Sequence, residues 1–341
     1  MAASARLLPV GHQQVRISSP ERLVWPGISK WDLATYLLAV AQPFLSAVAD
    51  RPVTLQRFPG GVDGEEFFSK NPPRGLPEYA RTVMCTYPSG RQHPQLVIDE
   101  AATAVWAVQM NTVTFHPWPV RSANTDNPDE LRIDLDPAPG TGFAQAVVAA
   151  HALRELMKEL GLTAWVKTSG NRGVHVYAPI TPTHEFQDVR HGVIGIAREL
   201  ERRLPELVTT AWWKEERGQK VFVDFNQANR DRTIACAYSP RPLAGAPVSM
   251  PVRWEDLDGV DPADFTVLTV PGLLNSQGDA WEQMPAAVGD LGPALELWQA
   301  DLDRGLGELN FPPEYPKMPG EPPRVQPSKI NKANWVQPPG Q

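Results

Sequence analysis

The chain has 341 residues, of which 42% are apolar and 21% charged, so it can bury a sizeable hydrophobic core and is not disordered throughout. Its 32 basic and 39 acidic residues give a formal net charge of −7, which argues against a broad basic surface for duplex DNA but allows a local basic groove. No stretch is apolar enough for a membrane span or a secretory signal, so we expect a cytoplasmic protein that does not contact membranes.

The two cysteines, Cys85 and Cys236, are too few for a disulfide framework or a four-thiolate zinc site. We therefore interpret them as ordinary core thiols in a reducing compartment.

In chain order, the first predicted helix begins after Ser29, whose hydroxyl can cap it while Asp32 occupies the third helical position as a capping-box partner. Its buried face is predicted to carry Leu33, Leu37 and Val40.

Two adjacent aromatic residues, Phe67 and Phe68, follow in a polar, turn-rich segment near Arg57 and Lys70. In a strand only one of the two rings can face the core, so the other is free to stack on an unpaired base while the cations meet phosphates. The alternative is that both rings simply pack under a loop.

The run LRIDLDP, residues 131–137, alternates apolar and polar residues as a half-buried strand does. Asp134 and Asp136 therefore share one face, with their Cα atoms about 6.6 Å apart, close enough to converge on one or two hard cations. The run VFVDF adds Asp224 as a third carboxylate on a strand. Oxygen ligands favour magnesium or manganese over zinc, whereas the alternative is solvated aspartates on an open sheet face.

Between these runs, helical periodicity predicts helices over 143–160, ended by Gly161, and over 189–204. Strands are predicted at AWVKTS and VHVYAP, and the mixture of helices, strands and hairpins indicates an α+β layered domain.

The loop Ser169–Gly173, with sequence SGNRG, joins these two strands. Its glycines allow a tight turn that exposes backbone N–H groups to an anion, and Ser169 and Arg172 add a hydroxyl and a guanidinium. His175 lies beside this cradle and can donate to a phosphate oxygen. A plain hairpin turn and a structural histidine are the alternatives.

A last helix is predicted over 291–309, followed from residue 311 by a proline-rich tail that we expect to be extended. The predicted organisation is a catalytic domain over residues 1–290, the terminal helix over 291–310 and the tail over 311–341. Within the domain we expect an N-terminal subdomain over about 1–110 and a catalytic core over about 111–290.

Five ordered motifs carry a resemblance that covers about residues 15–290: FFSKNPP, NTVTFHPW, RIDLDP, SGNRGVHVY and VFVDF. Together they resemble the archaeo-eukaryotic primase superfamily, and more closely the polymerase domain of the bacterial end-joining ligase D. The resemblance implies a primase-polymerase (RRM-like) core with mixed or antiparallel sheets flanked by helices.

The resemblance also implies residue roles. Two Mn²⁺ or Mg²⁺ ions are expected on Asp134, Asp136 and Asp224, and the incoming nucleoside triphosphate is expected among His116, Ser169, Arg172, His175, Gln227 and Arg241. The DNA-binding residues are expected to be Phe67, Phe68, Lys70 and Arg57 near the template, with Arg22 and Lys30 on the 5′-phosphate of the downstream strand.

Two departures from the family pattern bear on function. Arg172 stands where these polymerases usually have lysine, which keeps the charge but changes the geometry. The segment YPSGRQHPQ, where an end-bridging hairpin is expected, is short and has few charges, which argues against bridging of the two DNA ends of a break.

We therefore expect a stand-alone, monomeric nucleotidyltransferase that fills short gaps during DNA repair and prefers ribonucleotides, with a separate DNA ligase or end-binding protein as partner. Action at double-strand breaks, as an end-joining polymerase or primase, is the alternative within this class. A manganese glycosyltransferase with a D-x-D motif and a non-catalytic single-strand DNA binder are the alternatives of other classes.

Overall fold

The computed structural model describes residues 4–312, 315–318 and 320–322. The N-terminal part contains α1 (Lys30–Ala39), α2 (Ala41–Val48), α3 (Ala101–Gln109) and the strands β1 (Ala5–Val10), β2 (Gln13–Ser18), β3 (Leu23–Trp25), β4 (Ile28–Ser29), β5 (Pro52–Arg57), β6 (Phe67–Ser69), β7 (Arg81–Thr86), β8 (Gln92–Val97) and β9 (Thr112–Pro117). The rest contains α4 (Phe143–Glu159), α5 (Phe186–Arg203), α6 (Val270–Gln277), α7 (Gly292–Asp303) and the strands β10 (Glu130–Pro137), β11 (Trp165–Thr168), β12 (Val174–Pro179), β13 (Val208–Thr209), β14 (Val221–Asp224) and β15 (Pro251–Val252).

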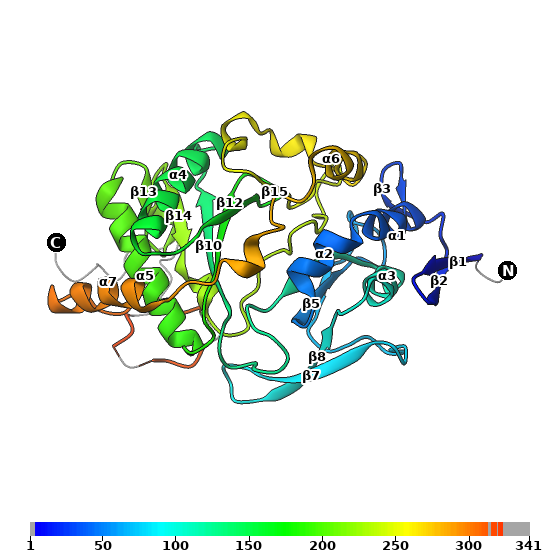
Figure 1. Cartoon of the computed structure of the whole chain (residues 1–341), viewed down its shortest axis with the longest axis horizontal. Coiled ribbons are helices and arrows are strands. Elements are labelled where there is room, and N and C mark those ends of the chain that lie inside the picture. The colour runs from blue at the N-terminus through cyan, green and yellow to red at the C-terminus, as the bar shows by residue number, and fades with distance from the viewer. Residues whose placement is uncertain (1–3, 313–314, 319, 323–341) are drawn as a thin grey trace, which may run out of the picture.

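Two sheets organise the molecule, one in each part (Figure 1). The first has the order β6-β5-β8-β7, with β9 also paired to β5. The second has the order β13-β14-β10-β12-β11-β15 and is antiparallel except for the pair β13–β14. Helices α4 and α5 pack on the second sheet. The predicted α+β class with largely antiparallel sheets is confirmed.

The first three predicted helices form as α1, α4 and α5, although α5 begins at Phe186 and not at residue 189. Ser29 caps α1 by accepting the N–H of Asp32 at 3.2 Å, and the Asp32 carboxylate accepts the N–H of Ser29 at 2.8 Å, which completes the predicted capping box. Helix α4 ends at Glu159, and Gly161 follows with φ +74.

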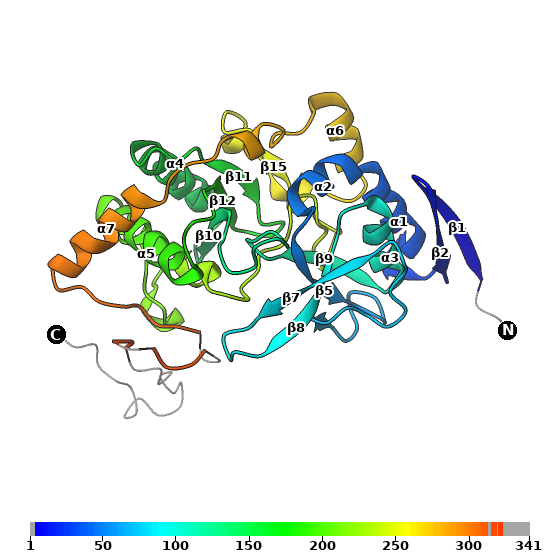
Figure 2. The ribbon, with the colours of Figure 1, turned by 60° about the horizontal axis from the view of Figure 1, so that its bottom comes forward.

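The last helix is shorter than predicted, because α7 ends at Asp303 instead of near residue 309. Gly305 takes φ +81, a left-handed conformation that stops a helix, and the N–H of Leu306 returns to the carbonyl of Asp301 at 2.9 Å. After this turn, residues 304–312 run back along α5, as Figure 2 shows below that helix. Phe311 and Tyr315 are buried, and the part of the predicted tail over 323–341 lies outside the described residues.

Helices α5 and α7 approach closely because α5 carries glycine where they cross. A Cβ atom on Gly195 would lie 2.8 Å from the backbone nitrogen of Trp298, so a side chain there would force the helices apart. On α5 the neighbouring residues are largely buried.

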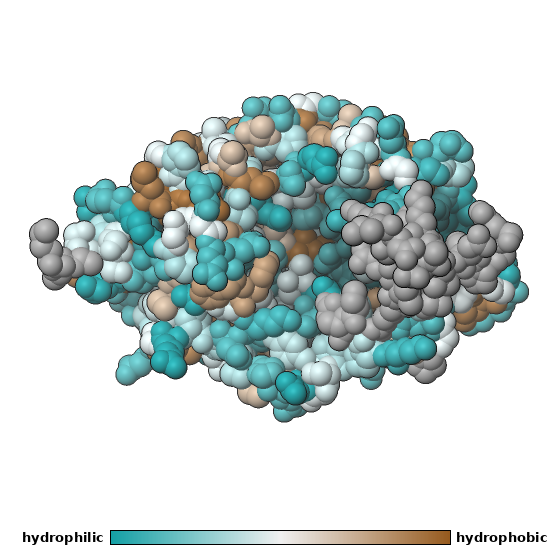
Figure 3. Space-filling model, turned by 180° about the vertical axis from the view of Figure 1, so that it is seen from behind, coloured by the Kyte–Doolittle hydropathy of each residue, from teal (hydrophilic) through white to brown (hydrophobic). Residues whose placement is uncertain are grey.

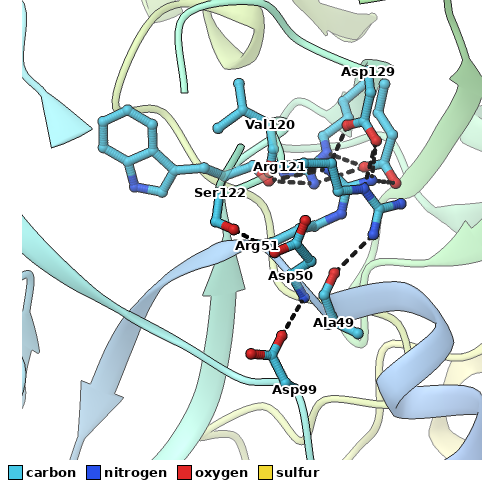
Figure 4. A network of polar contacts seen from close by, with 11 residues as sticks. Ala49, Asp50, Arg51, Asp99, Val120, Arg121, Ser122 and Asp129 are labelled. Atoms are coloured by element: carbon cyan, nitrogen blue, oxygen red, sulfur yellow. Dashed lines mark hydrogen bonds and ion pairs between the residues drawn. The ribbon is translucent and has the colours of Figure 1, made fainter. Parts of the chain in front are cut away.

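A buried arginine joins the two parts of the chain (Figure 4). Arg51, fully buried just before β5, bonds Asp129 Oδ1 and Glu130 Oε1, each at 2.5 Å, at the start of β10. Arg121 adds bonds to Asp129 Oδ2 and to the carbonyl of Ala49, both at 2.7 Å. Because a buried charge is costly unless paired, this network fixes the N-terminal sheet relative to β10.

Cys85 and Cys236 are both buried and free, which confirms them as core thiols. None of the helices among the described residues is long and apolar enough to cross a membrane. On the face shown in Figure 3 the surface is mostly hydrophilic, and hydrophobic residues form small separate patches.

Candidate active site

The site begins with strand register. β10 pairs antiparallel with β14 so that Asp134 lies directly opposite Asp224, and Asp136 lies two residues further along the same face of β10. Directly opposed residues in such a pair project from the same side of the sheet, so all three carboxylates share one face. The sequence placed Asp134 and Asp136 together, and the register adds Asp224.

The three carboxylates disfavour one another's charge. Burial and the negative charges of Asp224 and Asp136 raise the pKa of Asp134 to about 8, and burial raises the pKa of Asp224. The side chain of Asp224 is held by the backbone N–H of Asn226 at 3.0 Å and by Gln227 Nε2 at 2.9 Å.

These residues fit hard divalent cations by donor chemistry. Opposed carboxylates that repel one another gain most from a shared cation, and oxygen donors match Mg²⁺ or Mn²⁺. Their side chains do not form a closed ligand cage: in the described part of the chain no three His, Cys, Asp or Glu side chains converge on one point. An ion bound to these carboxylates would need further oxygen ligands, such as water or substrate phosphates.

The loop 169–173 turns tightly between β11 and β12. The Ser169 hydroxyl accepts the N–H groups of Asn171 at 3.2 Å and Gly173 at 3.0 Å. Gly170 has φ +72, and a Cβ atom there would lie 2.5 Å from Cγ of Arg241, so glycine lets the loop lie against that arginine. Arg172 is exposed at the tip of the loop.

Behind the loop, His175 on β12 bridges a lysine and a carboxylate. Its Nδ1 lies 2.6 Å from Lys167 Nζ, and its Nε2 lies 3.5 Å from Asp134 Oδ1. Lys167 also donates to the carbonyl of Ala235 at 2.9 Å and to the hydroxyl of Ser249, whose own hydrogen goes to the carbonyl of Thr168. Lys167 Nζ thus lies within hydrogen-bond distance of three acceptors, and His175 Nε2 faces Asp134.

Burial and neighbouring cations keep both histidines of the site neutral. Desolvation, Lys167 and Arg241 lower the pKa of His175 well below its ordinary value. Desolvation, then Arg241 and Lys167, lower the pKa of His116 on β9 to about 3. Both imidazoles can therefore donate one hydrogen bond and accept another at neutral pH.

An open cleft collects the predicted nucleotide residues. It is lined by His116, Asp134, Asp136, Ser169, Asn171, Arg172, Gly173, His175, Gln227, Thr233, Ile234, Ala235 and Arg241. Of the predicted metal and nucleotide residues, Asp224 alone is not in this lining, and it is bonded to Gln227, which is.

The aromatic pair borders this cleft. Phe67 and Phe68 on β6 are 39% and 50% exposed, so the alternative that both pack under a loop does not hold. The Phe68 ring meets His116 edge to face at 5.5 Å between centroids, and the Arg57 guanidinium lies over Phe67 at 4.8 Å. Lys70 lies nearby in an exposed ion pair with Asp231 at 2.9 Å.

The predicted phosphate pair, Arg22 and Lys30, lies in the N-terminal part. Lys30 is only 3% exposed and donates to the carbonyl of Ser18 at 3.2 Å. Burial and the charge of Arg22 lower the pKa of Lys30 to about 8. Arg22 donates to the carbonyl of Pro59 and to Asn111 Oδ1. The two cations are therefore close neighbours, an arrangement that an anion stabilises.

Two cations of the site escaped the sequence analysis. Lys167 could have been predicted, because a lysine inside an apolar strand needs a polar partner. A turn over 169–173 places it opposite His175 on the next strand. Arg217 had none: it lies in a loop, with its guanidinium 3.5 Å from the Phe222 ring centroid and attracted by Asp224 and Asp136.

Comparison with known proteins shows which family model and which characterised proteins this chain resembles. The model of the family described as "LigD, primase-polymerase domain" matches residues 29–281. The chain is 37% identical over 274 residues to the multifunctional non-homologous end joining protein LigD of Pseudomonas aeruginosa, covering 78% of this chain and 32% of that protein. It is 30% identical over 271 residues to the bifunctional non-homologous end joining protein LigD of Bacillus subtilis, covering 78% and 43%. The chain thus spans less than half the length of these relatives.

A solved structure extends the likeness to the fold. The polymerase domain from Mycobacterium tuberculosis ligase D in complex with DNA is 30% identical to this chain and superposes with a TM-score of 0.75. The match covers 81% of this chain and 99% of that domain.

The raised pKa of Asp134 predicts how stability depends on pH. Between the ordinary value of 3.8 and the folded value of about 8, the folded protein holds a proton that the unfolded chain has released. The free energy of unfolding therefore falls as pH rises through this range, by at most about 1.4 kcal/mol per pH unit. We expect the melting temperature of the metal-free protein to fall more steeply between about pH 5 and about pH 8 than that of Asp134→Asn.

Mn²⁺ is expected to raise the melting temperature more at the higher pH. The matched control is Asp258→Asn, which removes an exposed carboxylate near His151. Thermal melts with and without Mn²⁺ measure both effects. Parallel pH profiles of the melting temperature for the wild type and Asp134→Asn would contradict a raised pKa at Asp134.

Proposed function

The chain belongs to the LigD primase-polymerase domain family, and on that premise we propose that it is a template-dependent polymerase that fills short gaps in DNA during repair, preferring ribonucleotides. A primase-polymerase domain is a nucleotidyltransferase, which removes the glycosyltransferase and the non-catalytic binder as alternatives. The observation that carries the proposal is one cleft that joins opposed carboxylates, the tight turn over 169–173 and a border of two exposed phenylalanines.

In this proposal Asp134, Asp136 and Asp224 hold two Mn²⁺ or Mg²⁺ ions. When bound, such ions lower the pKa of an attacking hydroxyl and neutralise a pyrophosphate leaving group. The protein's own part is to keep the carboxylates opposed, to hold Asp224 through Gln227, and to place a neutral His175 beside Asp134.

The nucleoside triphosphate binds along the same cleft in this proposal. Ser169, Arg172 and Arg241 meet phosphate oxygens, with His116 and His175 as hydrogen-bond donors. Gln227 spends one N–H on Asp224, and its amide oxygen is then available to accept a ribose 2′-hydroxyl. A site that bonds this hydroxyl discriminates against the deoxynucleotide, which leaves the acceptor unpaired.

The proposed DNA partner is a gap whose downstream strand carries a 5′-phosphate. Phe67 and Phe68 stack on template bases, Arg57 and Lys70 meet the backbone, and Arg22 and Lys30 take the 5′-phosphate. The similar solved domain was crystallised with DNA, which supports a DNA substrate. Such a substrate implies action at the nucleoid in the cytoplasm, with sealing left to a DNA ligase.

Action at double-strand breaks is the second candidate, because the relatives named above are non-homologous end joining proteins. Against it stands the hairpin β7–β8, whose tip over residues 87–91 carries Arg91 as its one charged residue. A tip with so little charge offers few contacts to a second DNA end.

The metal assignment predicts loss of nucleotide addition in Asp134→Asn and Asp136→Asn. We expect primer extension across a one-nucleotide gap with Mn²⁺ to fall at least about 100-fold, because the charge that develops in the reaction is no longer stabilised. Affinity for gapped DNA is expected to stay near wild type, and Asp258→Asn is the charge-matched control. Undiminished extension by either variant would contradict the assignment of these two aspartates as metal ligands.

The 5′-phosphate pocket predicts tighter binding of a phosphorylated gap. Charge-assisted bonds are worth about 1.5–3 kcal/mol, so a 5′-phosphate is expected to bind about 10- to 150-fold more tightly than a 5′-hydroxyl at equal salt. Lys30→Gln is expected to shrink this ratio, whereas Lys158→Gln, on the exposed side of α4, leaves it unchanged. Fluorescence anisotropy gives the ratio, and equal affinities for both gaps in the wild type argue against the pocket.

The aromatic border predicts that Phe67→Ala with Phe68→Ala weakens binding of gapped DNA by about 1–3 kcal/mol per stacked base, equally for all four template bases. Because both rings are partly exposed, the free energy of unfolding is expected to fall by less than the roughly 3–5 kcal/mol that truncation of a single core phenylalanine costs. Leu268→Ala removes another exposed apolar side chain and serves as control. An early melt with unchanged DNA binding would assign the rings to folding instead.

A further inference from the structure

A second polar network lies behind the strand that carries Asp224, outside the cleft. Its centre is Arg190 on α5, which is fully buried. Its other members are Asn226, in the 3-10 turn η2 (Phe225–Ala228) directly after Asp224, and residues 308–311, which we term the C-terminal strap. The strap lies beyond residue 281, where the family match ends.

Arg190 ties the strap to the turn. Its Nε donates to Asn226 Oδ1 at 3.2 Å, its Nη1 to Glu308 Oε2 at 2.6 Å, and its Nη2 to the carbonyls of Leu309 at 2.9 Å and Asn310 at 3.3 Å. The guanidinium also lies 3.8 Å from the Phe311 ring centroid. A buried guanidinium needs all its donors paired, and the strap supplies most of the partners.

Asn226 connects this network to the metal-binding face. Its side chain accepts from Arg190, accepts from Asn229 Nδ2 at 2.7 Å and donates to the carbonyl of Asn310 at 2.9 Å. Its backbone N–H donates to Asp224 Oδ1 at 3.0 Å, and the next residue, Gln227, donates to Asp224 Oδ2. The side chain of Asn226 is thus fixed by the strap while its backbone fixes the carboxylate.

Glu308 is anchored from a second side. Its Oε1 bonds His191 Nε2, and the His191 ring stacks on Trp298 of α7 with centroids 4.3 Å apart and planes 5° apart. The start of the strap is therefore held by the packed pair α5–α7 through His191 as well as by Arg190.

We propose that the C-terminal strap, through Arg190 and Asn226, is a positioning device that holds Asp224 and Gln227 in the orientation needed for metal and nucleotide binding. This inference rests on the proposed function. Groups that hydrogen-bond metal-binding carboxylates orient them. Loosening these groups therefore weakens metal binding without removing a ligand.

The test uses Glu308→Gln in the full chain, which keeps the shape of the side chain and removes the charge that pairs with Arg190 and His191. Phe311→Leu is the second variant, because it removes the aromatic contact with Arg190 and keeps an apolar side chain. Glu159→Gln is the matched control, since it breaks the exposed ion pair with Arg203 far from the turn.

Mn²⁺ binding is measured by electron paramagnetic resonance in the absence of DNA and nucleotide, at a temperature where thermal melts show each variant folded. We expect Glu308→Gln and Phe311→Leu to weaken Mn²⁺ binding about 10-fold and to raise KM for nucleotide more than they lower kcat at saturating metal. A Mn²⁺ affinity equal to that of Glu159→Gln in both variants would overturn the proposal, whatever their melting temperatures. If Glu308→Gln does not fold, Phe311→Leu decides.

Failure of the proposed function has a different signature. If Asp224→Asn leaves Mn²⁺ binding unchanged, or if the wild type does not extend a primer, the polymerase site itself is misassigned. If the wild type passes both tests and the strap variants match the control, the positioning role alone is wrong.

Discussion

The opposition of Asp134 and Asp224 across two antiparallel strands is the constraint around which the rest of the site is arranged. Two carboxylates held this close in a partly buried position raise each other's free energy unless protons, cations or hydrogen bonds compensate. Gln227 and the backbone of Asn226 stabilise one carboxylate, and His175 faces the other. The remaining negative charge is the part that divalent ions can neutralise.

The cations that offset the charge of the carboxylates are gathered close to them, and the net charge of the chain does not show this. The chain as a whole is acidic, with a formal charge of −7, yet Lys167, Arg217 and Arg241 all lie within electrostatic reach of the carboxylates. Each pays a desolvation cost that lowers its pKa, and the carboxylates favour its charged form. Net charge therefore argues against a broad basic surface but gives no information about the cations around these carboxylates.

Local patterns predicted local structure well and distant pairing poorly. The capping box at Ser29, the alternation around Asp134 and the turn over 169–173 each depend on residues a few positions apart, so the sequence analysis found them. The end of α7 was wrong because helical periodicity continues past Gly305, whereas the backbone at that glycine is left-handed. Arg217 could not be found, because it lies in an irregular loop five residues before Phe222, where no helical or strand periodicity indicates which way a side chain faces.

The cleft also depends on contact between the two sheets, which no single motif encodes. The face with the three carboxylates belongs to β10 and β14, whereas the aromatic border belongs to β6, and the Phe68–His116 contact is where the N-terminal sheet meets the cleft. The Arg51 network fixes the N-terminal part against the start of β10, and the N–H of Phe115 on β9 donates to Ser239 Oγ at 2.9 Å in the second part. Because these links cross the junction through buried groups, packing fixes the position of Phe68 relative to the loop over 169–173, which are the places that the proposed function gives to a template base and a phosphate.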